Sequence, residues 1–159
     1  MDIDRLDLRI LAILQKNNRL SNIELADQVG LSAPACLKRV QRLRKEKVIV
    51  DDVSIINPKL VGNTLTMIVS VEMDRDQADI YQRFRRSMDQ APEITQCYQV
   101  SGNYDFLLVV CVKDIQAYEE FVDRVLHTQL NIRKFHTSVS LRTVKFSTEV
   151  DLKGLTKDR

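Results

Sequence analysis

The chain has 159 residues, of which 44% are hydrophobic and 29% charged, and its formal net charge is +2. This composition is typical of a folded protein with a buried core, and the length allows one domain or two small ones. No apolar run approaches the roughly 20 residues that span a bilayer, and the first ten residues are acidic and amphipathic, unlike a secretion signal. We therefore expect a cytoplasmic protein with no membrane partner.

The cysteines and the distribution of charge further limit the kinds of protein and site that the sequence allows. Cys36, Cys97 and Cys111 lie far apart without a C-x-x-C pair, and the chain has only two histidines. Neither a disulfide framework nor a metal site is indicated, so we expect no metal and no cofactor. Up to residue 64 there are 11 Lys or Arg against 8 Asp or Glu, and the cations concentrate between Lys38 and Lys47.

Hydrophobic periodicity predicts three helices in the first half of the chain. Apolar residues recur at helical spacing from residue 3 to residue 14. Ser21, followed by Glu24 three positions later, has the pattern of a capping box, and Gly30 closes a short second helix. Ser32 and Pro34 then begin a third helix that runs to about residue 46.

The third helix has two unlike faces. At 100° per residue, one face gathers Ala33, Cys36, Leu37, Val40 and Leu43, and the opposite face gathers Ala35 with several cations. A solvated surface is the ordinary interpretation of such a run. A short helix, a turn with glycine and a helix with a small first turn are, however, what helix-turn-helix docking requires, because small residues let the helix enter the major groove. We therefore predict DNA contacts from Ser32, Ala33, Pro34, Lys38, Arg39, Arg42 and Lys45.

The rest of the chain predicts a short connection and then a second domain. Residues 48–57 alternate, which predicts a strand as a rudimentary wing, and a linker follows. Strands at 65–73, 93–102, 105–112 and 134–148, with helices at 80–88 and 115–129, give the order βαββαβ. This α+β order is typical of a ferredoxin-like sheet with both helices on one face, and its apolar open face predicts dimerisation. The predicted parts are a DNA-binding domain 1–57, a linker 58–64, a ferredoxin-like domain 65–152 and a flexible tail 153–159.

Two motifs, "LS.....KRV.RL....VI" and "VSGNYDFLLVV", resemble the Lrp/AsnC family of leucine-responsive, or feast/famine, regulators in their order and spacing. The resemblance implies a nucleoid-associated transcription regulator that binds palindromic double-stranded DNA as a homodimer, assembles to octamers and responds to an amino acid or related metabolite. It implies effector contacts at Ser101, Gly102, Asn103, Tyr104 and Asp105, and on the last strand at Thr137 and Ser138.

The chemistry of the "SGNYD" turn suits an amino acid. Gly102 permits close backbone approach, and Asp105 can pair with an α-ammonium group. A plain hairpin turn, chosen for its backbone angles, is the alternative interpretation.

Two residues depart from the family pattern, and two other functions stay open. Lys47 stands where members commonly have glycine, so the helix either ends at a cost of about 1 kcal/mol or runs on. Arg142 stands where an acidic or neutral residue is frequent. One alternative is an effector-independent architectural DNA-binding protein. The other is an enzyme that resembles sirohaem decarboxylases and uses His127 and His136, although no nucleophile–base pair or phosphate loop is visible, so we predict no enzyme.

Overall fold

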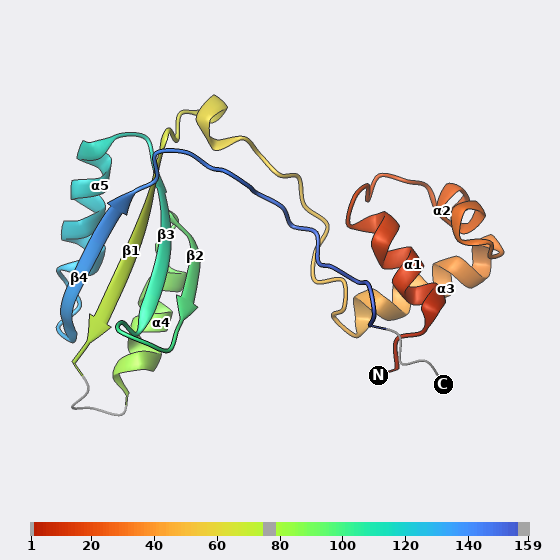
Figure 1. Ribbon diagram of the computed structural model, residues 1–159, viewed down its shortest axis with the longest axis horizontal. Helices are drawn as coiled ribbons and strands as arrows, with labels where there is room; N and C mark the ends of the chain where they lie inside the picture. The colour runs from red at the N-terminus through yellow and green to blue at the C-terminus, as the bar shows by residue number, and fades with distance from the viewer. Residues whose placement is uncertain (1, 75–78, 156–159) are drawn as a thin grey trace. The chain divides into compact units, whose positions relative to one another are not determined.

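The computed structural model describes residues 2–74 and 79–155 (Figure 1). The chain forms two compact units, of which the first combines Met1–Ile55 with Lys145–Arg159 and the second is Ile56–Val144. The first unit is therefore built from both ends of the chain, whereas the sequence predicts a second domain that runs to residue 152. Residues 156–159 of the predicted flexible tail lie outside the described residues.

The first unit contains the three predicted helices, α1 (Arg5–Leu14), α2 (Asn22–Val29) and α3 (Ala33–Lys45). α1 begins at a capping box in which the side chains of Asp4 and Asp7 each accept a hydrogen bond from the other residue's backbone N–H. Ser21 and Glu24 form the predicted capping box of α2. Gly30, with φ of 73°, ends α2 and turns the chain into α3.

The apolar faces of these helices meet in one small core. Leu37, which we expected on the packed face of α3, is 43% exposed. It stands about 100° around the helix from buried Cys36, so it falls at the margin of the packed face. The buried core residues are Ile10, Leu25, Ala26, Val29, Cys36, Val40 and Leu43.

α3 ends before Lys47 and does not run on past it, although Lys47 stands where glycine is common. This residue adopts a left-handed conformation with φ of 58°, and the N–H of Val48 donates to the carbonyl of Leu43 at 2.9 Å. The pattern is that of a helix end normally closed by glycine. Val48 and Ile49 then pack against the core of the unit, which holds the strained residue in place.

The predicted wing strand is wrong. Within the described part of the first unit no strand follows α3, and the chain continues without regular structure up to a 3-10 turn at Pro58–Val61. Val50, Val53 and Ile55 are all exposed. Their alternation has the period of a strand, but a strand also needs a partner to satisfy its backbone groups.

The second unit has the predicted βαββαβ order (Figure 1). Its sheet is antiparallel throughout, with the strand order β2-β3-β1-β4, and both helices pack on one face. A mostly aliphatic core with a few phenylalanine rings fills the space between sheet and helices, and Phe84 and Phe106 lie 4.6 Å apart between ring centroids. The elements are β1 (Leu65–Met73), α4 (Ile80–Asp89), β2 (Ile94–Gln99), β3 (Phe106–Val112), α5 (Ile115–Phe121), a π-helical continuation (Val122–Leu126) and β4 (Ile132–Val139).

The last strand ends earlier than predicted. β4 pairs with β1, and Val139 stands opposite Met67, close to the start of β1 at Leu65. Ser140 makes one more bond, from its N–H to the carbonyl of Thr66 at 2.8 Å. Residues 141–148 continue the alternating pattern, but β1 extends no further to pair with them. Arg142, the departure on the predicted last strand, therefore lies outside β4.

The C-terminal strap, residues 145–155, belongs to the first unit. The side-chain amide of Gln15, the C-cap residue of α1, binds the backbone of Val150 on both sides, donating to its carbonyl at 3.1 Å and accepting from its N–H at 3.0 Å. Lys16 and Glu149 add an ion pair at 4.0 Å. The amide of Gln15 donates and accepts as a backbone peptide group would, and it thus anchors the strap to the end of α1.

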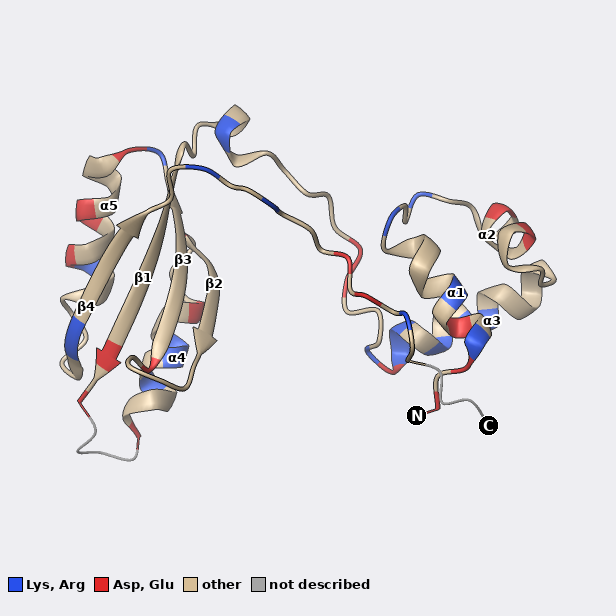
Figure 2. Cartoon of the chain, viewed as in Figure 1, with Lys and Arg blue, Asp and Glu red and all other residues tan. Residues whose placement is uncertain are grey.

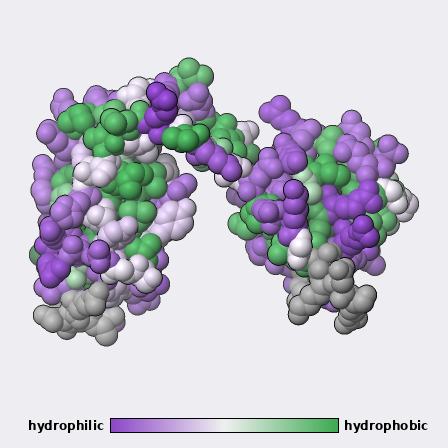
Figure 3. All heavy atoms as spheres, viewed as in Figure 1, coloured by the Kyte–Doolittle hydropathy of each residue, from purple (hydrophilic) through white to green (hydrophobic). Residues whose placement is uncertain are grey.

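The face of the sheet opposite the helices carries a half-buried apolar stripe. Strand register places Ile68 and Val109 opposite each other on this face, and Leu107 opposite Tyr98. Tyr98 is 51% exposed. No described helix covers this open face, and Figure 3 shows hydrophobic residues gathered on it.

Candidate functional site

The exposed side of α3 carries most of the predicted DNA contacts. Ser32, Pro34, Lys38 and Lys45 are exposed, and Ala33 is half-buried in the first turn. The amide of Asn22 on α2 donates to the carbonyl of Ala33 at 2.7 Å, which fixes the turn between the two helices. Figure 2 shows Lys and Arg along α3. The result is a cationic helix whose small first turn is presented to solvent, as entry into a major groove requires.

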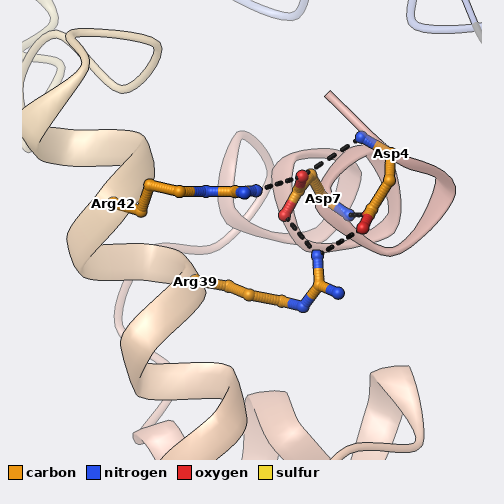
Figure 4. Close-up of polar contacts among 4 residues, drawn as sticks. All are labelled: Asp4, Asp7, Arg39 and Arg42. Atoms are coloured by element: carbon orange, nitrogen blue, oxygen red, sulfur yellow. Dashed lines mark hydrogen bonds and ion pairs between the residues drawn. The ribbon is translucent and has the colours of Figure 1, made fainter. Parts of the chain in front are cut away.

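Arg39 and Arg42, two further predicted DNA contacts, bind carboxylates of α1 (Figure 4). Asp7 bonds both guanidinium groups, that of Arg39 at 2.8 Å and that of Arg42 through its other oxygen. Asp4 accepts a second bond from Arg39 at 2.7 Å. We call these four residues the Asp–Arg cluster. Its two carboxylates balance its two guanidinium groups, so it adds no net charge to the cationic side of α3.

Burial makes Asp7 the centre of the Asp–Arg cluster. Its side chain is fully buried, whereas the side chains of Arg39 and Arg42 remain 26% and 43% exposed. Hydrogen bonds from the guanidinium of Arg39 to Asp4 and Asp7 raise the pKa of Arg39. Partial burial opposes ionisation of Asp4, but the bonds from the Asp7 N–H and Arg39 outweigh it and lower the pKa of Asp4.

Asp7 was not identified as a site residue from the sequence, although its position among the apolar residues of α1 indicates that it is buried. Asp7 stands between Ile3 and Ile10 at helical spacing, on the same face of α1 as buried Ile10. A carboxylate on the packed face of a helix requires a cationic partner. Arg44, by contrast, pairs with Asp52 at 2.8 Å, away from the Asp–Arg cluster.

The predicted effector turn divides into an exposed part and a buried base. Ser101, Gly102, Asn103 and Tyr104 are exposed, and Gly102 has φ of 132°, a conformation that favours glycine. Asp105 is buried at the base. The turn therefore offers small polar groups and backbone to a ligand, while its aspartate faces inward.

Asp105 joins the turn to β1 and α4. Its carboxylate accepts hydrogen bonds from the N–H of Met73 and the hydroxyl of Tyr81, both at 2.8 Å. Its own N–H donates to the carbonyl of Val71 at 2.8 Å, and its carbonyl accepts from Val100 at 2.9 Å. Asp105 is thus a structural anchor of the turn.

Thr137 and Ser138 lie on opposite faces of β4. Thr137 pairs with Val69 on the helix side of the sheet, and its hydroxyl is hydrogen-bonded to that of Tyr118 on α5. Burial raises the pKa of Tyr118, and the bond to Thr137 partly offsets this effect. Ser138 pairs with Ile68 on the open face. The two predicted effector contacts therefore serve different surfaces of one chain.

Two further properties of the described ranges bear on function. No helix in them is long and apolar enough to cross a membrane. No group of three or more His, Cys, Asp or Glu in the same ranges could hold a metal ion.

Comparison with known proteins assigns both units. Residues 3–50 match a family model described as winged helix-turn-helix DNA-binding, and residues 66–150 match the Lrp/AsnC ligand binding domain. An uncharacterized HTH-type transcriptional regulator of Sinorhizobium fredii is 47% identical, over 91% of this chain and 86% of its own length. The leucine-responsive regulatory protein of Escherichia coli is 34% identical, over 96% of this chain and 93% of its own length.

Solved structures of two transcriptional regulators have a similar fold over nearly the whole chain. A transcriptional regulator of Neisseria meningitidis in complex with L-Met has a TM-score of 0.90 and 29% identity, covering 98% of this chain and 100% of that one. An AsnC family transcriptional regulator of Agrobacterium tumefaciens has a TM-score of 0.88 and 34% identity, covering 94% of this chain and 97% of that one.

A helix-turn-helix unit with a cationic recognition helix, joined to a ligand-binding α+β unit, defines a DNA-binding transcriptional regulator. The described relatives are transcription regulators as well. This chain belongs to the Lrp/AsnC family.

Proposed function

We propose that this regulator binds palindromic operator DNA as a homodimer or higher oligomer and that an amino acid controls it. The exposed side of α3 carries the DNA part of the proposal. Lys38 and Lys45 are solvent-exposed behind a small first turn, where long cations reach phosphates or base edges. Two such helices in a dimer fit half-sites about one helical turn apart, or a multiple of it.

Footprinting and salt titration test the DNA interface. Lys38→Ala and Lys45→Ala remove exposed cations of α3, and Lys113→Ala removes an exposed cation of the second unit as a matched control. We expect the two α3 variants to weaken binding and to reduce the slope of log K against log[salt] by about 0.9 for each lost phosphate contact. Unchanged footprints and slopes in both variants would contradict this interface.

The open face of the sheet is the proposed dimer surface. Its stripe of Ile68, Leu107 and Val109 is apolar and has no described helix over it. Val109→Lys is expected to shift the molecular mass measured by light scattering toward the monomer. Ile115→Lys, at an exposed apolar position on α5, is the matched control and is expected to leave the mass unchanged.

The exposed turn 101–104 is the proposed effector contact, with Asp105, Thr137 and Ser138 completing the set. The resemblance to a structure bound to L-Met favours an amino acid as the ligand class. A thermal-shift screen against the twenty amino acids tests this, because a ligand at a hundred times its Kd adds about 2.7 kcal/mol to the stability of the folded state. Asn103→Ala is expected to reduce the shift, since Asn103 is exposed and its loss leaves the base of the turn intact.

The screen also separates the remaining functions. No shift from any amino acid, together with normal footprints, would favour an effector-independent architectural DNA-binding protein.

We propose that the chain is not an enzyme, and the placement of the two histidines supports this. His127 contacts the ring of Phe135 and bonds Asp123 at 2.9 Å. His136 follows Phe135 on β4 and so points to the open face, away from His127. We further propose that the protein acts in the cytoplasm at the nucleoid.

A further inference from the structure

A buried carboxylate of α1 binds two arginines of the recognition helix. Asp7 is fully buried, and each of its oxygens accepts a bond from a different guanidinium group, one from Arg39 and one from Arg42 (Figure 4). The two arginines are three residues apart, so they are neighbours on one face of α3. Both are predicted DNA contacts.

The bonds to the carboxylates leave donors available. A guanidinium group has five N–H donors in a rigid plane. The contacts to Asp4 and Asp7 use one terminal nitrogen of Arg39, and the contact to Asp7 uses one of Arg42. Both side chains remain partly exposed, and each is bound to the carboxylates through one terminal nitrogen only, so the other donors are not used by the cluster.

The charges of the Asp–Arg cluster also cancel. Lys38, Lys45 and Lys47 are exposed cations of the same segment and lie outside the cluster. Non-specific attraction to DNA follows the number of phosphates that free cations neutralise. Arg39 and Arg42 therefore contribute less to this attraction than two unpaired arginines, while their orientation favours contacts of defined geometry.

We propose that Asp7 is a positioning residue for DNA recognition, which holds Arg39 and Arg42 for operator contacts and restrains them from non-specific phosphate binding. This inference rests on the proposed function, in that α3 must face DNA. Asp4 has a secondary role, because it bonds Arg39 alone. Asp7 thus raises the ratio of operator affinity to non-specific affinity without touching DNA.

The test compares two duplexes with the full-length chain. One duplex is selected from a randomised pool by the wild-type protein, and the other is a scrambled duplex of the same composition. Fluorescence anisotropy at several salt concentrations gives the affinity ratio and the salt slope for Asp7→Asn. Asp2→Asn, which removes an exposed carboxylate of the same unit, is the control for the change in net charge.

Asp7→Asn is expected to lower the ratio of operator to scrambled affinity at least about tenfold, the scale of one well-oriented arginine contact to a base. The slope for the scrambled duplex is expected to steepen by about 0.9 for each phosphate that a released arginine neutralises. Asp2→Asn is expected to leave the ratio unchanged.

A second variant keeps the test decisive if Asp7→Asn does not fold. Asp4→Asn preserves the N-cap of α1, since asparagine caps as well as aspartate, but removes the negative charge beside Arg39. It is expected to lower the ratio by a smaller factor. A ratio equal to that of Asp2→Asn in the variants that fold would overturn the proposal. That failure is distinct from failure of the proposed function, in which Lys38→Ala and Lys45→Ala would also leave DNA binding intact.

Discussion

Replacement of Asp105 by alanine is expected to destabilise the second unit before it reveals anything about the effector. The carboxylate is buried and accepts bonds from the N–H of Met73 and the hydroxyl of Tyr81. In Asp105→Ala the buried N–H of Met73 loses this acceptor, at a cost of about 1 to 3 kcal/mol. The lost bond of Tyr81, which is half-buried, adds about 0.5 to 1.5 kcal/mol.

The combined loss of roughly 1.5 to 4.5 kcal/mol is large against the 5 to 15 kcal/mol of a typical domain. For a domain of 60 to 100 residues, each kcal/mol lowers Tm by about 4 to 8 °C. Differential scanning calorimetry of the full chain is therefore expected to show the transition of the second unit shifted down by at least about 6 °C.

Asp105→Asn is the matched variant. Asparagine has nearly the same size and keeps a carbonyl oxygen that can accept from Met73, so we expect a shift of less than half that of alanine. Equal transitions for wild type and Asp105→Ala would refute the role of Asp105 as an anchor. Because the loss of an effector response in Asp105→Ala combines ligand contact with unfolding, Asn103→Ala is the cleaner test of the effector site.

Three further outcomes are expected in the first unit. Ser21→Ala removes the N-cap of α2 and is expected to lower the free energy of unfolding by about 1 kcal/mol in a urea titration. Hydrogen bonds from the Ser21 hydroxyl and N–H lower the pKa of Glu24 in the folded state. Their stabilisation is therefore complete above the usual pKa of 4.5 and is lost as the pH falls from 4.5 through the lowered pKa of the folded state. Acid titration followed by circular dichroism is expected to show this loss in wild type and a weaker one in Ser21→Ala. Lys47→Gly relieves the left-handed conformation at the end of α3 and is expected to raise stability by about 1 kcal/mol, a gain whose absence in thermal melts would contradict the strain.

The elements that local pattern determines were predicted well. The capping box of Ser21 and Glu24, the glycine turn at Gly30 and the apolar periodicity of α4 all appear in the structure. Each of these signals acts over a few residues, so one sequence suffices to find them. The order βαββαβ follows from the same signals, and the ferredoxin-like arrangement follows from the order.

The errors come from features that depend on distant partners. Residues 141–148 alternate like a strand, yet β4 ends at Val139 because β1 begins at Leu65. The expected wing around Val50 to Ile55 likewise has the period of a strand without one to pair with. Pairing is a property of two segments, and periodicity reports only one.

The candidate site shows the same limit. The cationic face of α3 was visible in the sequence, but the bonds of Arg39 and Arg42 to Asp7 join residues more than thirty positions apart. The sequence gives the charges of these side chains and not their partners. Thr137 and Ser138 are adjacent in sequence, yet strand alternation sends them to opposite faces of the sheet.

The C-terminal strap has a practical consequence for exchanging parts between regulators. Because Gln15 binds the backbone of Val150, the folded helix-turn-helix unit includes residues from the far end of the chain. A hybrid joined once, near residue 56, would combine the helices of one protein with the strap of another. A graft with two junctions, one near residue 56 and one near residue 144, transfers the complete unit and keeps the glutamine with the segment that it binds.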